Sequence, residues 1–213
     1  MKNNADAIIF RTKICAENVT NIFYPTRKTA FADFSCGSSN INVLGVEVSM
    51  LNIVLFEPEI PQNTGNIGRT CVATGTRLHL IGPMGFKIDE KSVKRAGMDY
   101  WDKLNVKEYI GYEDFIEKNP EAKIYMATTK AKHRYTDVKF EEDCYIMFGK
   151  ESAGIPEELL VDNEEKCIRI PMNEDIRSLN LANSVAIVLY EALRQHDFNG
   201  MQSEGELHRL HWK

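Results

Sequence analysis

The stretch LNIVLFEPEIPQNTGNIGRTC, residues 51–71, contains both kinds of element from which this chain is built. Its opening run, LNIVLF, is almost continuously apolar, as in strands buried on both faces of a parallel sheet. After a loop rich in proline and glutamate, the pattern predicts a helix over residues 64–73. Asn63 is a good N-cap for that helix, and Gly75 is a good stop at its end. A buried strand followed by a helix indicates an α/β fold.

The same alternation continues along the rest of the chain. Strand-like runs occupy residues 77–82, 105–110, 123–129, 144–149 and 167–172. Helix-like runs occupy residues 89–95, 112–119, 156–162 and 181–195, the last with a clear apolar face. Strands that alternate with helices predict an α/β domain with a parallel sheet.

Residues 1–49 differ from the remainder because they show no sustained period. Met50 reads as a natural start for the regular part. We therefore expect residues 1–49 to be an extension, loosely ordered or non-native, and residues 50–213 to form the functional domain.

Composition narrows the class of protein. Apolar residues make up 43% and charged residues 27% of the 213 residues, which is ordinary for a globular protein. The five cysteines are scattered and form no CxxC pair, and the N-terminus lacks a signal peptide. These features predict a cytoplasmic protein with reduced thiols, no membrane association and no metal site.

The net charge of −5 argues against a general polyanion binder, although a local basic patch can still bind RNA. Two basic clusters are candidates. They comprise Lys87, Lys91, Lys94 and Arg95, and then Lys130, Lys132, His133 and Arg134. Each can equally be a solvated surface.

Three predicted strands end in unusual residues, at positions 127–130 (ATTK), 148–154 (FGKESAG) and 170–180 (IPMNEDIRSLN). Ligands of parallel sheets bind beyond the carboxyl ends of the strands. Small residues there let a ligand approach the backbone, which suits an adenine-bearing cofactor as well as other nucleotides. The chain has neither GxGxxG after its first strand nor a P-loop, since Glu151 stands where a P-loop needs a hydroxyl.

The helix after Asn63 carries a second candidate site. Gly65, Asn66 and Arg69 share one helical face. Two interpretations remain open from the residues alone. Arg69 can bind a phosphate or carboxylate of a ligand, or it can form a surface ion pair while Gly65 and Gly68 permit close helix packing.

Three motifs together resemble those of the SPOUT superfamily of RNA methyltransferases. They are NTGNIGR at 63–69, FGKESAGIP at 148–156 and IPMNEDIRSLNLANSVAIVLYEALRQ at 170–195. The resemblance covers residues 50–213 and is closest to the compact tRNA 2′-O-ribose methyltransferases that modify the wobble nucleotide, cytidine or modified uridine 34. The opening stretch and RAGMDYW at 95–101 are also typical of that subfamily.

The resemblance implies a C-terminal trefoil knot, S-adenosyl-L-methionine as methyl donor, and a homodimer with the last helix in its interface. It implies cofactor contacts from residues of the three loops. These are Ala127, Thr128, Thr129, Gly149, Lys150, Glu151, Ile170, Pro171, Met172, Ser178, Leu179 and Asn180.

The resemblance also assigns catalysis to Arg69, with Asn63, Glu151, Ser178 and Asn180 as the other motif residues. A guanidinium rarely gives up its proton, so we expect Arg69 to hold the phosphate beside the target ribose rather than act as a base. The partner would be a tRNA anticodon stem-loop, recognised through exposed bases. Its predicted contacts are Lys91, Lys94, Arg95, Lys130, Lys132 and Arg134.

Two alternatives stand beside this interpretation. The chain could methylate another ribose of tRNA or ribosomal RNA, or it could be an RNA-binding homologue that has lost catalysis. The presence of all the motif residues disfavours the second.

Overall fold

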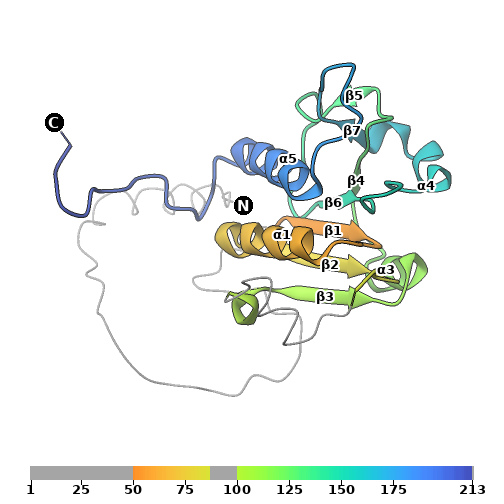
Figure 1. Ribbon diagram of the computed structural model, residues 1–213, viewed down its shortest axis with the longest axis horizontal. Coiled ribbons are helices and arrows are strands. Elements are labelled where there is room, and N and C mark those ends of the chain that lie inside the picture. Colours follow the sequence, from red (N-terminus) through yellow and green to blue (C-terminus); the bar gives the residue numbers. More distant parts are fainter. Residues whose placement is uncertain (1–49, 87–99, 213) are drawn as a thin grey trace, which may run out of the picture. The chain divides into compact units, whose positions relative to one another are not determined.

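The computed structural model describes residues 50–86 and 100–212 (Figure 1). The predicted extension at 1–49, the predicted helix at 89–95 and the basic residues Lys91, Lys94 and Arg95 lie outside this range.

The described residues form a seven-stranded parallel sheet. Its strands are β1 (Asn52–Phe56), β2 (Arg77–Ile81), β3 (Val106–Tyr109), β4 (Ile124–Ala127), β5 (His133–Arg134), β6 (Tyr145–Phe148) and β7 (Cys167–Arg169). Their order in the sheet is β3-β2-β1-β6-β4-β7-β5, and every neighbouring pair is parallel. The predicted α/β class with a parallel sheet is confirmed.

Helices cover the sheet. They are α1 (Pro61–Thr74), α3 (Tyr112–Lys118), α4 (Glu157–Val161) and α5 (Leu181–Gln195), with 3-10 turns η1 (Trp101–Lys103) and η2 (Glu164–Lys166). Helices α1 and α5 pack against each other, as Figure 1 shows. None of the helices in the described ranges combines the length and apolarity needed to cross a bilayer.

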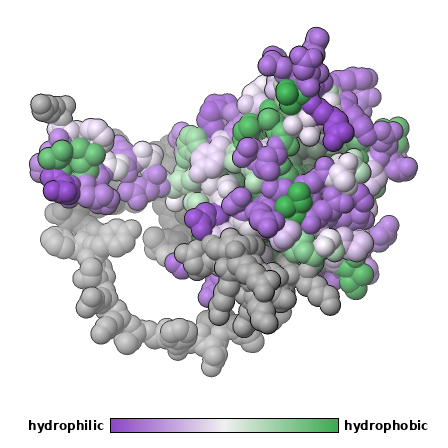
Figure 2. Space-filling model, viewed as in Figure 1, coloured by the Kyte–Doolittle hydropathy of each residue, from purple (hydrophilic) through white to green (hydrophobic). Residues whose placement is uncertain are grey.

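Alternate residues of the buried strands supply two hydrophobic cores, as the pleat of a strand requires. Ile53 and Leu55 of β1 pack with Ile67 of α1 and Val188 of α5. Val54 and Phe56 point the other way, toward a cluster that contains Phe115 of α3 and Leu160 of α4. The visible face in Figure 2 is mostly hydrophilic, with apolar residues in separate patches.

The predicted start of α1 is wrong. The helix begins at Pro61 with Ile60 as N-cap, so Asn63 lies within its first turn. Proline suits this position because its missing N–H has no partner to find there and its φ is already helical. The predicted stop at Gly75 is confirmed, with a left-handed φ of 66°.

The remaining boundaries follow the sequence closely. The range 181–195 for α5 is correct, whereas Pro156 caps α4 instead of lying in its first turn. The two-residue strand β5 had no signal in the sequence, because its residues His133 and Arg134 are exposed and polar.

Candidate active site

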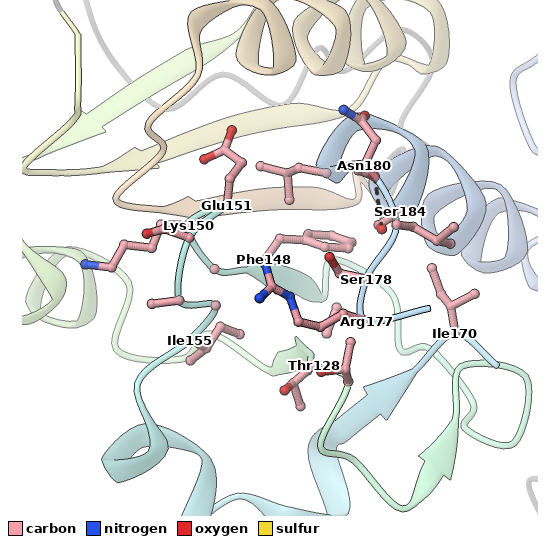
Figure 3. A pocket seen from close by; sticks show the side chains of 18 of the residues that line it. Thr128, Phe148, Lys150, Glu151, Ile155, Ile170, Arg177, Ser178, Asn180 and Ser184 are labelled. Atoms are coloured by element: carbon pink, nitrogen blue, oxygen red, sulfur yellow. Dashed lines mark hydrogen bonds between the residues drawn. The ribbon is translucent and has the colours of Figure 1, made fainter. Parts of the chain in front are cut away.

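A cavity of about 570 Å³ lies at the carboxyl ends of β4, β6 and β7 (Figure 3). The three predicted loops, at 127–130, 148–154 and 170–180, supply most of its lining. All the predicted cofactor-binding residues line it except Pro171, which is exposed. The volume falls within the range of about 300–1,000 Å³ that is usual for small-molecule sites.

The loop after β6 turns sharply at the floor of the cavity. The Gly154 N–H donates to the Lys150 carbonyl at 2.8 Å. A Cβ at Gly149 would lie only 1.9 Å from the Gly154 carbonyl carbon, so only glycine fits at that position. The close approach of Gly149 to the backbone of Gly154 and Ile155 fixes the tight turn of the loop that lines the cavity.

A chain of hydrogen bonds connects three separate segments beside the cavity. The Asn63 Nδ2 donates to Glu151 Oε1 at 2.9 Å, and the Asn180 Nδ2 donates to Asn63 Oδ1 at 2.9 Å. The other Glu151 oxygen accepts from the backbone N–H of Glu59 at 2.9 Å. Asn180 also caps α5 through its Oδ1, which accepts from the N–H groups of Ala182 and Asn183. The motif residues Asn63, Glu151 and Asn180 are thus in direct contact.

Two glutamates that the sequence reasoning missed fasten the same loop to the end of β1. Glu57 forms an ion pair with Lys150 at 2.8 Å, and this hydrogen-bonded carboxylate raises the pKa of Lys150. Glu59 accepts from the Ser152 N–H at 2.9 Å and from its hydroxyl at 2.8 Å. Their signal was the pair of acids directly after the first strand, in FEPEIP.

Arg69 lies on the exposed side of α1 and does not line the cavity of its own chain. Its guanidinium sits 4.9 Å from the centre of the Tyr100 ring, and the Tyr100 hydroxyl donates to the Gly65 carbonyl. The packing role considered for the glycines holds for Gly68, where a Cβ would approach Leu104 to 3.1 Å.

Three of the six predicted RNA-contacting residues lie within the described ranges, and each forms an ion pair with an acidic side chain. Lys130 pairs with Glu157 at 2.6 Å, Lys132 with Glu164 at 2.6 Å, and Arg134 with Asp137 at 2.8 Å. All three basic side chains are exposed. Exposed pairs of this kind contribute about 0–1 kcal/mol and exchange partners readily.

Metal-binding clusters and reactive thiols are the other groups to consider in the part of the chain that the structure describes. No group of His, Cys, Asp and Glu there could hold a metal ion. Burial raises the pKa of the Cys71 and Cys144 thiols to about 12, so both stay protonated at neutral pH.

Comparison with known proteins gives a consistent result. The sequence pattern of the SpoU rRNA Methylase family matches residues 50–190. A protein of Photorhabdus asymbiotica named tRNA (cytidine(34)-2′-O)-methyltransferase is 48% identical over 158 residues, covering 71% of this chain and 97% of that protein.

Two solved structures are similar in fold. One, described as "Structural insights into the 2-OH methylation of C/U34 on tRNA", has a TM-score of 0.66 and 40% identity, and covers 70% of this chain and 97% of that one. The other is an AdoMet-bound rRNA methyltransferase from Sinorhizobium meliloti, with a TM-score of 0.61 and 27% identity, covering 68% of this chain and 56% of that one.

Proposed function

The chain belongs to the SpoU rRNA methylase family, and we propose that it methylates the ribose 2′-hydroxyl of the wobble nucleotide, cytidine or uridine 34, in tRNA. The methyl donor is S-adenosylmethionine, in keeping with the AdoMet-bound relative. The observation that carries the proposal is the hydrogen-bond chain through Asn63, which joins helix α1 to the cavity.

The cavity has the features that this cofactor requires. Phe148, Ile155, Ile168 and Ile170 give it apolar walls for a planar base. Gly149 permits the tight turn that brings the backbone of this loop to the cavity wall. When bound, the cofactor supplies an electrophilic methyl group on a sulfonium.

The protein's own contribution is alignment. Methyl transfer requires the 2′-oxygen in line with the methyl group, and a fixed approach of this kind removes much of the barrier. Asn63, Glu151 and Asn180 hold one another in place, while Ser178 lines the cavity beside them. We assign these residues to orienting the ribose and the methionine end of the cofactor.

In this proposal, Arg69 of one chain acts at the cavity of a second copy of the chain. It lies outside the cavity of its own chain, and the family resemblance implies a dimer whose sites are shared. Ile187 and Tyr190 of α5 are exposed and three residues apart, so they form one apolar face for such an interface. Arg69 would then hold the phosphate next to the target ribose and stabilise charge on the 2′-oxygen.

We extend the proposal to the organisation of the chain. Residues 50–213 form the methyltransferase domain with a C-terminal trefoil knot, and residues 1–49 are an extension outside it. The family match over residues 50–190 supports this boundary. The cell compartment would be the cytoplasm. Limited proteolysis tests the boundary, because strong protection of residues 1–49 would contradict it.

The anticodon stem-loop would bind through exposed basic side chains, with Lys130, Lys132 and Arg134 exchanging their acidic partners for phosphates. The remaining contacts proposed for this surface are Lys91, Lys94 and Arg95. Each exchange releases one weak exposed pair, so its cost is small.

The test is direct methylation of defined RNA. Purified protein and S-adenosylmethionine are incubated with a tRNA that carries C34 or U34, and the 2′-O-methyl nucleotides are mapped by mass spectrometry. We expect one methyl group, at nucleotide 34. Methylation of a different tRNA position, or of ribosomal RNA only, would replace this substrate, and cofactor binding without any methylation would indicate an inactive homologue.

A further inference from the structure

Three cationic side chains line the cavity, and they differ in their partners. Lys130 is paired with Glu157, and Lys150 is paired with Glu57. Arg177 lines the same cavity but forms no ion pair with any residue in 50–86 or 100–212. Figure 3 shows its guanidinium pointing into the cavity from the loop before α5.

The Glu151 carboxylate and the first turn of helix α5, both beside the cavity, are already occupied by hydrogen bonds. Both oxygens of Glu151 accept hydrogen bonds, from Asn63 and from the backbone of Glu59. This carboxylate is therefore satisfied without Arg177. The first N–H groups of α5 donate to the Asn180 side chain, so they are not available to an anion. Of the three cationic side chains in the lining, Arg177 is the one that has no acidic partner within 50–86 and 100–212, so its fork of donors can bind a negative ligand group at no cost in lost ion pairs.

We infer that Arg177 binds an oxyanion of a ligand at the mouth of this cavity and is a positioning residue for the reaction. The inference rests on the proposed function. An arginine suits this task because its planar fork can make two parallel charge-assisted hydrogen bonds to a carboxylate or a phosphate. Holding a cation unpaired in a ligand cavity otherwise brings the fold no stabilisation.

Two ligand groups carry the required charge. One is the carboxylate of the methionine end of S-adenosylmethionine, and the other is the phosphate next to the target ribose. The first would affect cofactor binding alone, and the second would affect RNA binding alone. The two sources therefore give different results with the same variant.

The cofactor arm compares Arg177→Ala with the unchanged protein by calorimetry. The probes are S-adenosylhomocysteine, S-adenosylmethionine and decarboxylated S-adenosylmethionine. If Arg177 holds the carboxylate, the variant loses about tenfold or more in affinity for the first two probes, the loss expected of one charged hydrogen-bonded pair. It binds the decarboxylated probe as the unchanged protein does. Equal weakening for all three probes would overturn the inference, because the contact would then not involve an anion.

The RNA arm measures binding of an anticodon stem-loop at several salt concentrations. If Arg177 holds a phosphate, Arg177→Ala leaves cofactor affinity unchanged, weakens RNA binding and lowers the salt dependence by about one counterion. Arg177→Lys should restore part of the lost affinity in either arm, because it keeps the charge and loses the fork. Unchanged affinity in both arms would overturn the inference.

The control is Arg209→Ala, which removes an exposed arginine far along the chain from the cavity loops. Thermal unfolding checks that both variants remain folded. The cofactor arm needs no RNA substrate. Its affinities therefore still test the role of Arg177 if the wobble nucleotide proves not to be the target.

Discussion

Asn63 illustrates how a single polar residue can join two halves of a site. It is buried within a helix, at 6% exposure, where a polar side chain must find partners. Its amide has both a donor and an acceptor, so it can donate to Glu151 and accept from Asn180 at once. No carboxylate or hydroxyl of similar reach offers this combination in a fixed orientation.

Replacing Asn63 by alanine should therefore lower the rate of methylation by tenfold or more, while unfolding free energy falls by about 1–3 kcal/mol. The loss leaves one Glu151 oxygen and one Asn180 donor without their partner. Rates come from single-turnover methylation and stability from urea unfolding. A variant that is destabilised by this amount yet reacts at the normal rate would show that the hydrogen-bond chain is only structural.

Arg69 makes a contrasting case, because it is exposed and outside the cavity. We expect Arg69→Ala to abolish turnover while cofactor affinity changes less than about threefold, since only transition-state contacts are removed. Arg69→Lys should recover little, because a point charge cannot reproduce the fork of donors. Parallel collapse of cofactor affinity, measured by calorimetry, would contradict this role.

His79 predicts a specific dependence of stability on pH. Its ring is fully buried and bonded to Tyr109 and Asn52, and burial, followed by the charges of Arg77 and Lys107, lowers its pKa to about 3. The unfolded chain takes up this proton near pH 6.5, whereas the folded chain resists it to about pH 3. Stability is therefore complete above pH 6.5 and falls as the pH is lowered.

Between pH 7 and pH 5 this one histidine should remove about 2 kcal/mol of stability. Urea unfolding at pH 5, 6 and 7 measures the slope, and His79→Gln is the control that lacks the titrating ring. The variant should be less stable at pH 7 and should show a shallower slope. The same slope in both proteins would show that other groups dominate.

Sequence reasoning found most of the side chains of the site, but not all of their roles. Asn63, Glu151 and Asn180 stand in recognisable motifs, and the structure brings them together. Arg177 stands in the third motif as well, yet only the folded arrangement shows that it forms no ion pair within residues 50–86 and 100–212. The acids that pair with Lys130 and Lys132 are likewise set by folding, since Glu157 and Glu164 are distant in the chain.

At the level of elements, continuous apolar runs were reliable predictors of strands. Residues of β1, β4 and β6 are buried on both faces, and no surface helix shows that pattern. The start of α1 was mispredicted because Asn63 resembles a cap, while its amide serves the site instead. Strand β5 was missed because a two-residue edge strand has no periodicity to detect.

The turn of residues 149–154 gives a matched pair of glycines. Gly149→Ala would force a Cβ to 1.9 Å from the Gly154 backbone, whereas Gly154 has open space but a φ of 77°. We expect Gly149→Ala to displace the turn and lower cofactor affinity by about 100-fold or more, the loss of several contacts together. Gly154→Ala should cost about 1–2 kcal/mol of strain and only a few-fold of affinity.

Calorimetry with S-adenosylhomocysteine measures both variants, and circular dichroism confirms that each is folded. If the two substitutions lower cofactor affinity equally, the close approach of Gly149 to the Gly154 backbone does not determine the shape of the cavity. If neither does, the ligand does not contact this turn.

At the scale of the whole molecule, Arg69 does not line the cavity of its own chain, and its guanidinium lies over the Tyr100 ring. In the proposed twofold dimer, helix α1 of each chain would face the cavity of the other chain and so supply Arg69 to it. The exposed pair Ile187 and Tyr190 on one face of α5 is compatible with this dimer, since the buried core of a subunit interface is apolar and rich in tyrosine.

Mixing two impaired variants, at a cofactor concentration too low to fill the cavity of Gly149→Ala, tests whether Arg69 acts across such an interface. Chains with Arg69→Ala keep an intact cavity, and chains with Gly149→Ala keep Arg69. If each site combines the cavity of one chain with Arg69 of the other, mixed dimers regain one complete site. Random reassociation after mild denaturation should then restore about a quarter of the normal activity, because half of the dimers are mixed and each has one working site.

The outcome separates the two possible arrangements. If Arg69 serves the cavity of its own chain, a mixed dimer holds one site without Arg69 and one without a cavity, so activity stays absent. Light scattering on the same samples confirms that dimers have formed, which distinguishes failed association from catalysis within one chain. Recovery of activity would therefore place Arg69 across a subunit contact, and its absence in confirmed dimers would return Arg69 to its own chain.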